Sequence, residues 1–173
     1  GEYLNGERNG KGKEYYNNKL IFNGEYLNGQ RWNGKSKEYN NDKLIFEGEY
    51  LNGEKNGKWK EYYNDKLKFE GEYLNGERNG KCKEYYNGKI IFDGEYLNGK
   101  KYGKGKEYYY NGELILEGEY LNGTKNGKGK EYYNGKLIFE GEYLNGERNG
   151  KGKEYYYNGE LKFEGEYLNG KRN

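Results

Sequence analysis

The chain has 173 residues, of which 35% are charged and 31% apolar, with a formal net charge of +2, no His and one Cys. These counts leave no usual nucleophile–base pair and no transition-metal cluster, and the charge excess is smaller than a nucleic-acid binder normally carries. We therefore expect no enzymatic activity, no cofactor and no nucleic-acid partner.

The hexapeptide Gly-Glu-Tyr-Leu-Asn-Gly divides the whole chain into units. Its copies begin at residues 1, 24, 48, 71, 94, 118, 141 and 165. A short unit repeated at this spacing predicts an array in which each unit packs on its neighbours. The chain starts and stops within a unit, so we expect residues 1–173 to be a single array that forms part of a longer one.

Each unit predicts two strands. In the first full unit, residues 20–27 and 35–39 have strand-like composition, residues 28–34 form a loop, and residues 40–42 form a turn. The turn residues are Asn, Asp and Gly, which tolerate the left-handed backbone that a tight hairpin requires. The prediction is an all-β fold: an elongated, single-layer antiparallel meander, or β-hairpin repeat solenoid, of about 15 strands, curved and twisted.

Charge fixes the predicted register. A three-residue loop between the second strand and the next first strand places Glu14 opposite Phe22 and Tyr16 opposite Leu20. The residue before the hexapeptide is usually acidic, and the same register pairs it with a lysine; opposite charges across strands stabilise a sheet.

The other loop of the unit is predicted to have four residues, with Tyr3 opposite Gly10. Some units carry an extra residue, such as Trp32 or the third tyrosine of residues 108–110. We expect these insertions to lie in loops and to leave the strand registers unchanged.

The two sides of the predicted sheet differ. One side, the aromatic face, carries Phe22, Gly24 and Tyr26 together with glycines and a glutamate of the second strand. The other side, the charged face, carries Lys11, Lys13 and their acidic partners. Glycine opposite tyrosine lets the ring lie over the neighbouring backbone, so we expect a trough with the aromatic face inside.

The unit resembles the MORN repeat. The resemblance rests on Phe22-x-Gly24-Glu25-Tyr26-x-Asn28-Gly29 followed by Asn33-Gly34-Lys35, and it extends over essentially all 173 residues. A His common in the family is Asn at positions such as Asn9, and the Lys-Glu-Tyr-Tyr stretch is similar to a bacterial antitoxin-like variant. The resemblance implies a scaffold that docks partner proteins, some as a helix in the groove, and that lies at membranes beside the cytoskeleton. The single cysteine, Cys82, fits a reducing compartment, so we expect a cytoplasmic location.

We therefore expect a partner peptide or helix, with basic residues, along the aromatic face. The candidate partner-binding residues are Phe22, Tyr26, Ser36, Glu38, Phe46, Tyr50, Trp59, Glu61, Phe69, Tyr73, Cys82, Glu84 and Tyr96. Ser36, Trp59 and Cys82 stand where the other units have glycine, and a tryptophan in a groove is typical of binding hot spots. The glutamate row admits a second interpretation, hydrogen bonding to neighbouring tyrosines.

Two alternatives stay open. The first is attachment to anionic phospholipid through lysines of the charged face, which the resemblance also implies; the candidates are Lys35, Lys37, Lys58, Lys60, Lys81 and Lys83. The second is a self-assembling or engineered array, in which the uncapped end strands associate end to end.

Overall fold

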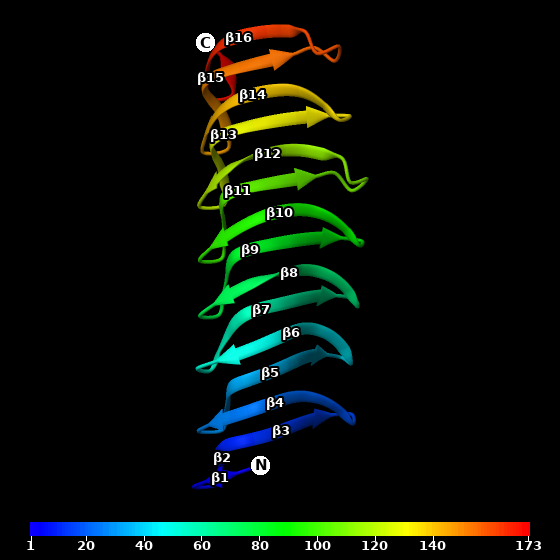
Figure 1. Cartoon of the computed structure of the whole chain (residues 1–173), viewed down its shortest axis with the longest axis vertical. Coiled ribbons are helices and arrows are strands. Elements are labelled where there is room, and N and C mark those ends of the chain that lie inside the picture. Colours follow the sequence, from blue (N-terminus) through cyan, green and yellow to red (C-terminus); the bar gives the residue numbers. More distant parts are fainter. The chain divides into compact units, whose positions relative to one another are not determined.

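The computed structural model describes residues 1–173 and contains strands and turns but no helix. Strands β1 and β2 form a small separate hairpin, and β3 to β17 form one open antiparallel sheet in sequential order (Figure 1). The predicted all-β meander is therefore confirmed. The structure offers no helix long and apolar enough to cross a membrane.

Apart from the short strands β1, β2 and β17, the first and second strands of the repeat units follow one another along the chain. Their bounds are β1 Tyr3–Leu4, β2 Glu7–Arg8, β3 Gly10–Tyr16, β4 Lys19–Leu27, β5 Gln30–Asn40, β6 Lys43–Leu51, β7 Glu54–Tyr63, β8 Lys66–Leu74, β9 Glu77–Tyr86, β10 Lys89–Leu97, β11 Lys100–Tyr108, β12 Leu114–Leu121, β13 Thr124–Tyr133, β14 Lys136–Leu144, β15 Glu147–Tyr155, β16 Leu161–Leu168 and β17 Lys171–Arg172.

The chain divides into two compact parts, Gly1–Gly80 and Lys81–Asn173. Within each part, successive Asn-Gly turns are joined by main-chain hydrogen bonds. In the first part, the Gly53 amide donates to the Trp32 carbonyl at 2.9 Å, and in the second the Gly146 amide donates to the Lys125 carbonyl at 2.8 Å. Because these turns lie at the edge of the sheet, these hydrogen bonds fix each turn against the next turn of the same part.

The central register is the predicted one, but the three-residue loop is wrong. Glu14 pairs with Phe22 as expected, whereas Tyr15, not Tyr16, pairs with Leu20 across a β-bulge. The bulge makes room for a two-residue turn in which Asn17 and Asn18 both have positive φ, 46° and 59°. Turns with this geometry match the right-handed twist of the flanking strands, so the chain combines the charge register with a tight turn.

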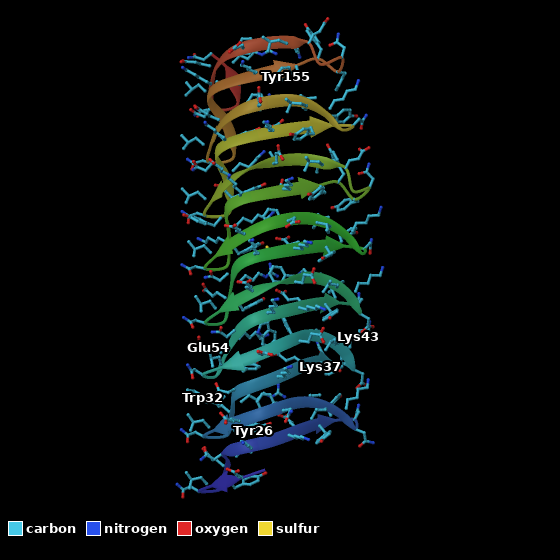
Figure 2. The ribbon with its side chains drawn as sticks, in the orientation of Figure 1. Tyr26, Trp32, Lys37, Lys43, Glu54 and Tyr155 are labelled. Carbon is cyan, nitrogen blue, oxygen red and sulfur yellow. The ribbon has the colours of Figure 1, made fainter.

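The predicted four-residue loop is also wrong. Tyr3 pairs with Arg8 rather than Gly10, across a two-residue Asn-Gly turn. Equivalent turns recur along the chain, and the register shifts inside the strands instead. Lys43 and Glu54, which follow the two kinds of turn, lie at opposite ends of the hairpins (Figure 2).

The extra residues behave in two ways. Trp32 lies within β5, and Phe22 pairs with Ser36, whereas the equivalent Phe46 pairs with Glu61. The expectation that Trp32 leaves the register unchanged is therefore wrong: the β4–β5 pairing is displaced by two residues. The extra tyrosine of residues 108–110 does lie in a loop, and Gly105 still pairs with Gly118 as predicted.

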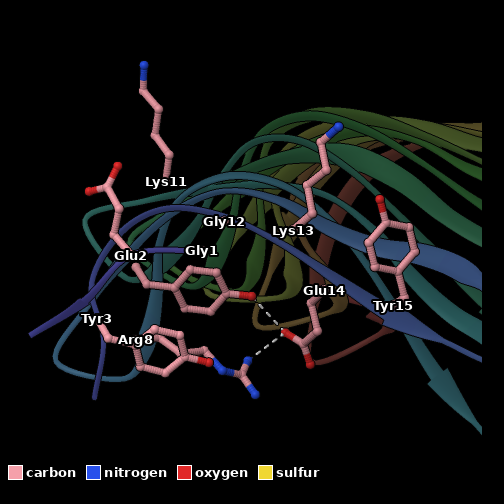
Figure 3. A pocket seen from close by; sticks show the side chains of 10 residues that line it. Gly1, Glu2, Tyr3, Arg8, Lys11, Gly12, Lys13, Glu14 and Tyr15 are labelled. Atoms are coloured by element: carbon pink, nitrogen blue, oxygen red, sulfur yellow. Dashed lines mark hydrogen bonds and ion pairs between the residues drawn. The ribbon is translucent and has the colours of Figure 1, made fainter. Parts of the chain in front are cut away.

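The two faces separate as predicted. Figure 3 shows Lys11 and Lys13 on one side of the sheet and Glu14 and Arg8 on the other. The core is the aromatic face, where six aromatic or leucine side chains are at most 1% exposed; these are Phe22, Trp59, Phe69, Phe92, Leu116 and Phe139. The rings replace the second packed layer that most domains use.

Ring packing depends on paired glycines. A methyl group added at Gly94 would lie 2.6 Å from the Phe92 ring, and one added at Gly105 would lie 2.7 Å from it. The Phe92 ring therefore lies directly over the backbone of both strands, and it also contacts Tyr96 and Tyr120 edge to face, with centroids 6.1 and 5.6 Å away. This confirms the predicted role of glycine opposite an aromatic ring.

Candidate partner-binding face

A glutamate, a tyrosine and a cation form a recurring set on the aromatic face. Glu61 accepts a hydrogen bond from the Tyr73 hydroxyl at 2.5 Å and forms an ion pair with Arg78 at 2.6 Å. The three residues come from successive strands, β7, β8 and β9. The set confirms that the glutamate row bonds to tyrosine hydroxyls, which was one of its two predicted roles.

The same set recurs in most repeats. The glutamate and tyrosine pairs are Glu14 with Tyr26, Glu38 with Tyr50, Glu84 with Tyr96, Glu131 with Tyr143, and Glu154 with Tyr167. Four of these glutamates also form an ion pair: Glu14 with Arg31, Glu38 with Lys55, Glu131 with Arg148, and Glu154 with Arg172. A partner with basic residues would therefore compete with cations that the chain itself supplies.

The cations also cover the core rings. The Arg78 guanidinium lies 4.0 Å from the Phe69 ring centroid, and Arg148 lies at the same distance from Phe139. Such contacts contribute roughly 0.5–1 kcal/mol at exposed sites and more when desolvated. Sequence reasoning missed this row of cations. Its signal was a basic residue recurring two positions after most Asn-Gly turns.

These contacts shift the pKa values of the groups they join. Hydrogen bonds from Arg172 and Tyr167 outweigh burial and lower the pKa of Glu154 to about 2. Burial opposes the same effect at Glu131, but Arg148 and Tyr143 still lower its pKa. Burial and a hydrogen bond to a glutamate raise the pKa values of Tyr50 and Tyr73 to about 12.

The shifts predict loss of stability at both pH extremes. An unfolded glutamate titrates near 4.5, so the stabilisation by Glu154 is complete above that pH and is lost as the pH falls toward about 2. A tyrosine titrates near 10 when unfolded, so the stabilisation by Tyr50 and Tyr73 is complete below 10 and is lost between 10 and about 12. Urea midpoints measured across both windows should fall at each end.

A matched variant separates these groups from general charge effects. Glu154→Gln should flatten the acid limb more than the alkaline limb, to which Tyr50 and Tyr73 still contribute. A constant urea midpoint from pH 4.5 to about 2 would contradict the assignment.

The unit around Trp59 departs from the regular packing. Where a phenylalanine covers the glycine of the hexapeptide elsewhere, Trp59 covers Gly48, and a methyl group added there would lie 2.3 Å from the indole. The indole nitrogen donates to the Glu49 carbonyl at 2.8 Å and Trp59 is 1% exposed. Trp59 therefore occupies the place of the ring of Phe46.

Phe46 and Tyr50 are partly exposed as a result. Their counterparts in neighbouring hairpins, Phe69 and Tyr73, are buried. The Lys55 ammonium lies 3.5 Å from the Phe46 centroid and pairs with a carboxylate, Glu38, at 3.3 Å. We name Phe46, Tyr50 and Lys55, packed on Trp59, the irregular patch.

The other predicted partner-binding residues lie deeper. Phe22, Tyr26, Phe69, Tyr73 and Tyr96 are buried in ring contacts, and Ser36, Cys82 and Glu61 are buried too. The Arg31 guanidinium donates to the Ser36 hydroxyl at 2.8 Å. Glu38 and Glu84 are half-buried. Only Phe46 and Tyr50 among the predicted rings present accessible surface, and partner binding by the set stays a prediction.

The charged face contains two kinds of lysine. Lys37 and Lys60 flank Glu47 at 3.7 and 3.9 Å, which confirms the predicted pairing with the acidic row. Lys58 and Lys81 are exposed and make no ion pair, and Lys35 is 82% exposed with a long contact of 3.9 Å to Glu49. The predicted lipid-binding lysines therefore fall into a matched row and a largely unmatched row; Lys83 belongs to the first by position.

The unmatched row has a structural cause. In other hairpins, the glutamates opposite the equivalent lysines, Lys104 and Lys128, turn toward the backbone of the following strand. Glu119 accepts from the Lys128 amide at 3.0 Å, and Glu142 accepts from the Lys151 amide at 3.2 Å. The lysine side chains then extend into solvent.

These features define an array of β-hairpin repeats with a self-packed aromatic face and no second layer. The MORN repeat model matches residues 1–20, 46–66, 69–89, 92–113, 117–136, 139–160 and 163–173. The chain belongs to the MORN repeat family, a class of non-catalytic repeats that act as protein- and membrane-interaction modules. The longest unmatched stretch, residues 21–45, contains Trp32 and the displaced register. Comparison with curated proteins gave no match.

Proposed function

We propose that the chain is a non-enzymatic scaffold that binds a protein partner at the irregular patch on its aromatic face. The observation that carries this proposal is the partial exposure of Phe46 and Tyr50, whose counterparts in the next hairpin, Phe69 and Tyr73, are buried. Aromatic side chains that are accessible yet held rigidly by packed neighbours are typical of binding hot spots.

The geometry supports a partner with an apolar anchor flanked by charge. Tyr50 contacts the Trp59 indole edge to face, with centroids 5.5 Å apart, so its ring has little freedom to lose on binding. The Glu38–Lys55 ion pair lies beside these rings and offers both signs of charge. A peptide or helix that inserts an apolar side chain between the two rings could pair its own charged residues with Glu38 or with Lys55.

Trp59→Gly gives the sharpest test, because it restores the glycine of the regular units. Phe46 should then settle over Gly48, as Phe92 covers Gly94, and the patch should close. Proteins captured on the immobilised chain are identified by cross-linking. The affinity of each is then measured by titration against the wild-type chain and the variants. We expect Trp59→Gly and Phe46→Ala to weaken binding at least about tenfold, in line with loss of a hot-spot residue.

Tyr63→Ser is the control, since Tyr63 is 69% exposed and lies outside the patch. It should bind as the wild type does. Circular dichroism and urea unfolding verify that each variant is folded. Equal capture by the wild type, Trp59→Gly and Phe46→Ala would refute the proposal.

The largely unmatched lysine row favours a second function, attachment to anionic membranes. Each exposed lysine near an anionic surface contributes about 1 kcal/mol, so Lys35→Gln with Lys58→Gln should weaken vesicle binding about thirtyfold. Lys37→Gln with Lys60→Gln removes the same charge from the matched row and should weaken it less. Sedimentation with phosphatidylserine and with neutral vesicles measures this, and absence of salt-sensitive binding would exclude it.

A further inference from the structure

We propose that Tyr86 with Tyr110, and Tyr133 with Tyr157, are sites of oxidative cross-linking, at which a peroxide-dependent oxidant joins neighbouring hairpins through a dityrosine bond. The proposal is independent of the irregular patch and of the lysine rows. It follows from two matching ring pairs at the hairpin tips and from the scarcity of other accessible side chains that oxidants attack.

The second ring of each pair comes from a longer loop. The hairpin of β9 and β10 turns through Asn87 and Gly88 alone. Two other hairpins turn through residues 109–113, between β11 and β12, and through residues 156–160, between β15 and β16 (Figure 1). Each of these loops carries the third tyrosine of a Tyr-Tyr-Tyr run, Tyr110 in one and Tyr157 in the other. The chain therefore contains the same loop twice.

Each third tyrosine lies against a tyrosine of the preceding hairpin. The ring centroids of Tyr86 and Tyr110 are 4.6 Å apart with an interplanar angle of 39°, and those of Tyr133 and Tyr157 are 5.7 Å apart at 42°. The exposed fractions are 51% and 67% in the first pair and 43% and 62% in the second. The pairs thus share one geometry, and an oxidant can reach both rings of each.

A lysine of the preceding hairpin holds each loop beside its partner. Lys89 Nζ donates to the Asn111 carbonyl at 3.4 Å, and Lys136 Nζ donates to the Tyr157 carbonyl at 2.6 Å. The lysine and the tyrosine of the preceding hairpin flank the same turn, so that tip contacts the next loop at two points. Exposed side chains change rotamer within about nanoseconds, so the rings can reach bonding distance without a change of fold.

The coupling balances as a two-electron oxidation by hydrogen peroxide. A haem peroxidase takes one electron and one phenolic proton from each ring. The two phenoxyl radicals join through the carbons ortho to their oxygens, and the hydrogens of those carbons move to the oxygens as the rings regain aromaticity. Hydrogen peroxide accepts the two electrons and two protons and leaves as two water molecules. Each cross-link therefore removes two hydrogens from the chain.

Other side chains that oxidants attack are absent or covered. Accessible thiols and methionine thioethers are common targets, but the chain contains no methionine and Cys82 is 5% exposed. Trp59 is 1% exposed, and tyrosines of the aromatic face such as Tyr143 are buried beside glutamates. Oxidation is thereby directed to the exposed tyrosines, and those with adjacent rings are placed to couple within one chain.

The bond would brace one hairpin against the next. A covalent link between residues 86 and 110 restricts the unfolded chain in the way that a disulfide does. The cross-linked monomer should therefore unfold at a higher urea concentration than the unmodified chain.

The test uses the whole chain, a peroxidase and a limiting amount of hydrogen peroxide. At about 1 μM chain, two rings on one chain, with an effective concentration on the order of 1 mM, should couple in preference to rings on separate chains. The monomer is isolated by size exclusion, and dityrosine fluorescence measures its yield. Digestion and tandem mass spectrometry should find one peptide pair joined through residues 86 and 110 and one joined through residues 133 and 157, each lighter by two hydrogens.

Phenylalanine variants assign the bonds, because phenylalanine keeps the ring and cannot form the phenoxyl radical. Tyr110→Phe should lose the first linked peptide pair and Tyr157→Phe the second, and the double variant should lose both. The matched control is Tyr15→Phe with Tyr63→Phe. These residues are 59% and 69% exposed and belong to neither pair, so both links should remain.

A third tyrosine contact provides a comparison within the same chain. The centroids of Tyr16 and Tyr39 are 6.4 Å apart, and Tyr39 is half-buried, so this pair should couple more slowly than the other two. The proposal would be overturned by dityrosine formed mainly between chains or between Tyr16 and Tyr39, by links that persist in the Tyr110→Phe, Tyr157→Phe double variant, or by a cross-linked monomer with an unchanged urea midpoint.

Discussion

Replacing Phe139 by alanine is expected to lower the free energy of unfolding by about 3–5 kcal/mol. Phe139 is fully buried and contacts the rings of Tyr143 and Tyr167, with the Arg148 guanidinium over its face. The sheet has no second layer that could close over the gap, so the cavity would open the core of two hairpins. Urea unfolding followed by tyrosine fluorescence measures the loss.

The chain provides its own control for this substitution. Leu116 holds the equivalent position in another hairpin and is 1% exposed. Phe139→Leu should therefore cost less than Phe139→Ala, because leucine leaves a smaller cavity. If alanine and leucine at position 139 proved equally tolerated, the ring stack would not be the source of stability.

Replacing Glu61 by alanine is expected to cost about 3–5 kcal/mol, as loss of one partner of a buried ion pair does. Glu61 is 8% exposed and accepts from both Tyr73 and Arg78. Its removal would leave a guanidinium and a hydroxyl in a largely dry environment without their shared acceptor. Equilibrium unfolding in urea measures the effect.

Glu72→Ala is the matched control, because Glu72 is exposed on the charged face and is opposite Lys58. Surface substitutions of this kind usually change stability by less than about 0.5 kcal/mol. Equal losses for Glu61→Ala and Glu72→Ala would show that the glutamate, tyrosine and cation set does not stabilise the sheet.

The predictions that proved correct concern the middle of the strands. Glu14 opposite Phe22, and Glu47 between two lysines, follow from charge and ring complementarity across neighbouring strands. Such pairs act between residues that the repeat places at fixed separations, so eight copies of one unit were enough to find them.

The predictions that failed concern the turns and one insertion. A two-residue turn with a β-bulge and a three-residue loop without one give the same charge pairs in the middle of the strands. That is why a three-residue loop could be inferred where Asn17 and Asn18 form a two-residue turn. Trp32 was placed in a loop, yet it extends β5 and displaces its pairing with β4.

The candidate site was found only in part. Trp59 stood out because it interrupts a row of small residues, whereas Phe46 and Tyr50 were predicted only as members of the aromatic row. Their different exposures could not be inferred, because they depend on which ring reaches the glycine pair first. The cations over the rings were missed for a similar reason: Arg78 meets Glu61 across two strands, seventeen positions later in the chain.

The repeat unit by itself determined an all-β meander, its central register and the division into an aromatic and a charged face, because these follow from local composition and from pairing between adjacent strands. Only the tertiary structure decided how the strands turn, which cations cover the rings and which two rings are exposed. Those outcomes depend on which of several side chains, from three successive strands, packs over a given stretch of backbone. A sequence pattern does not specify that choice.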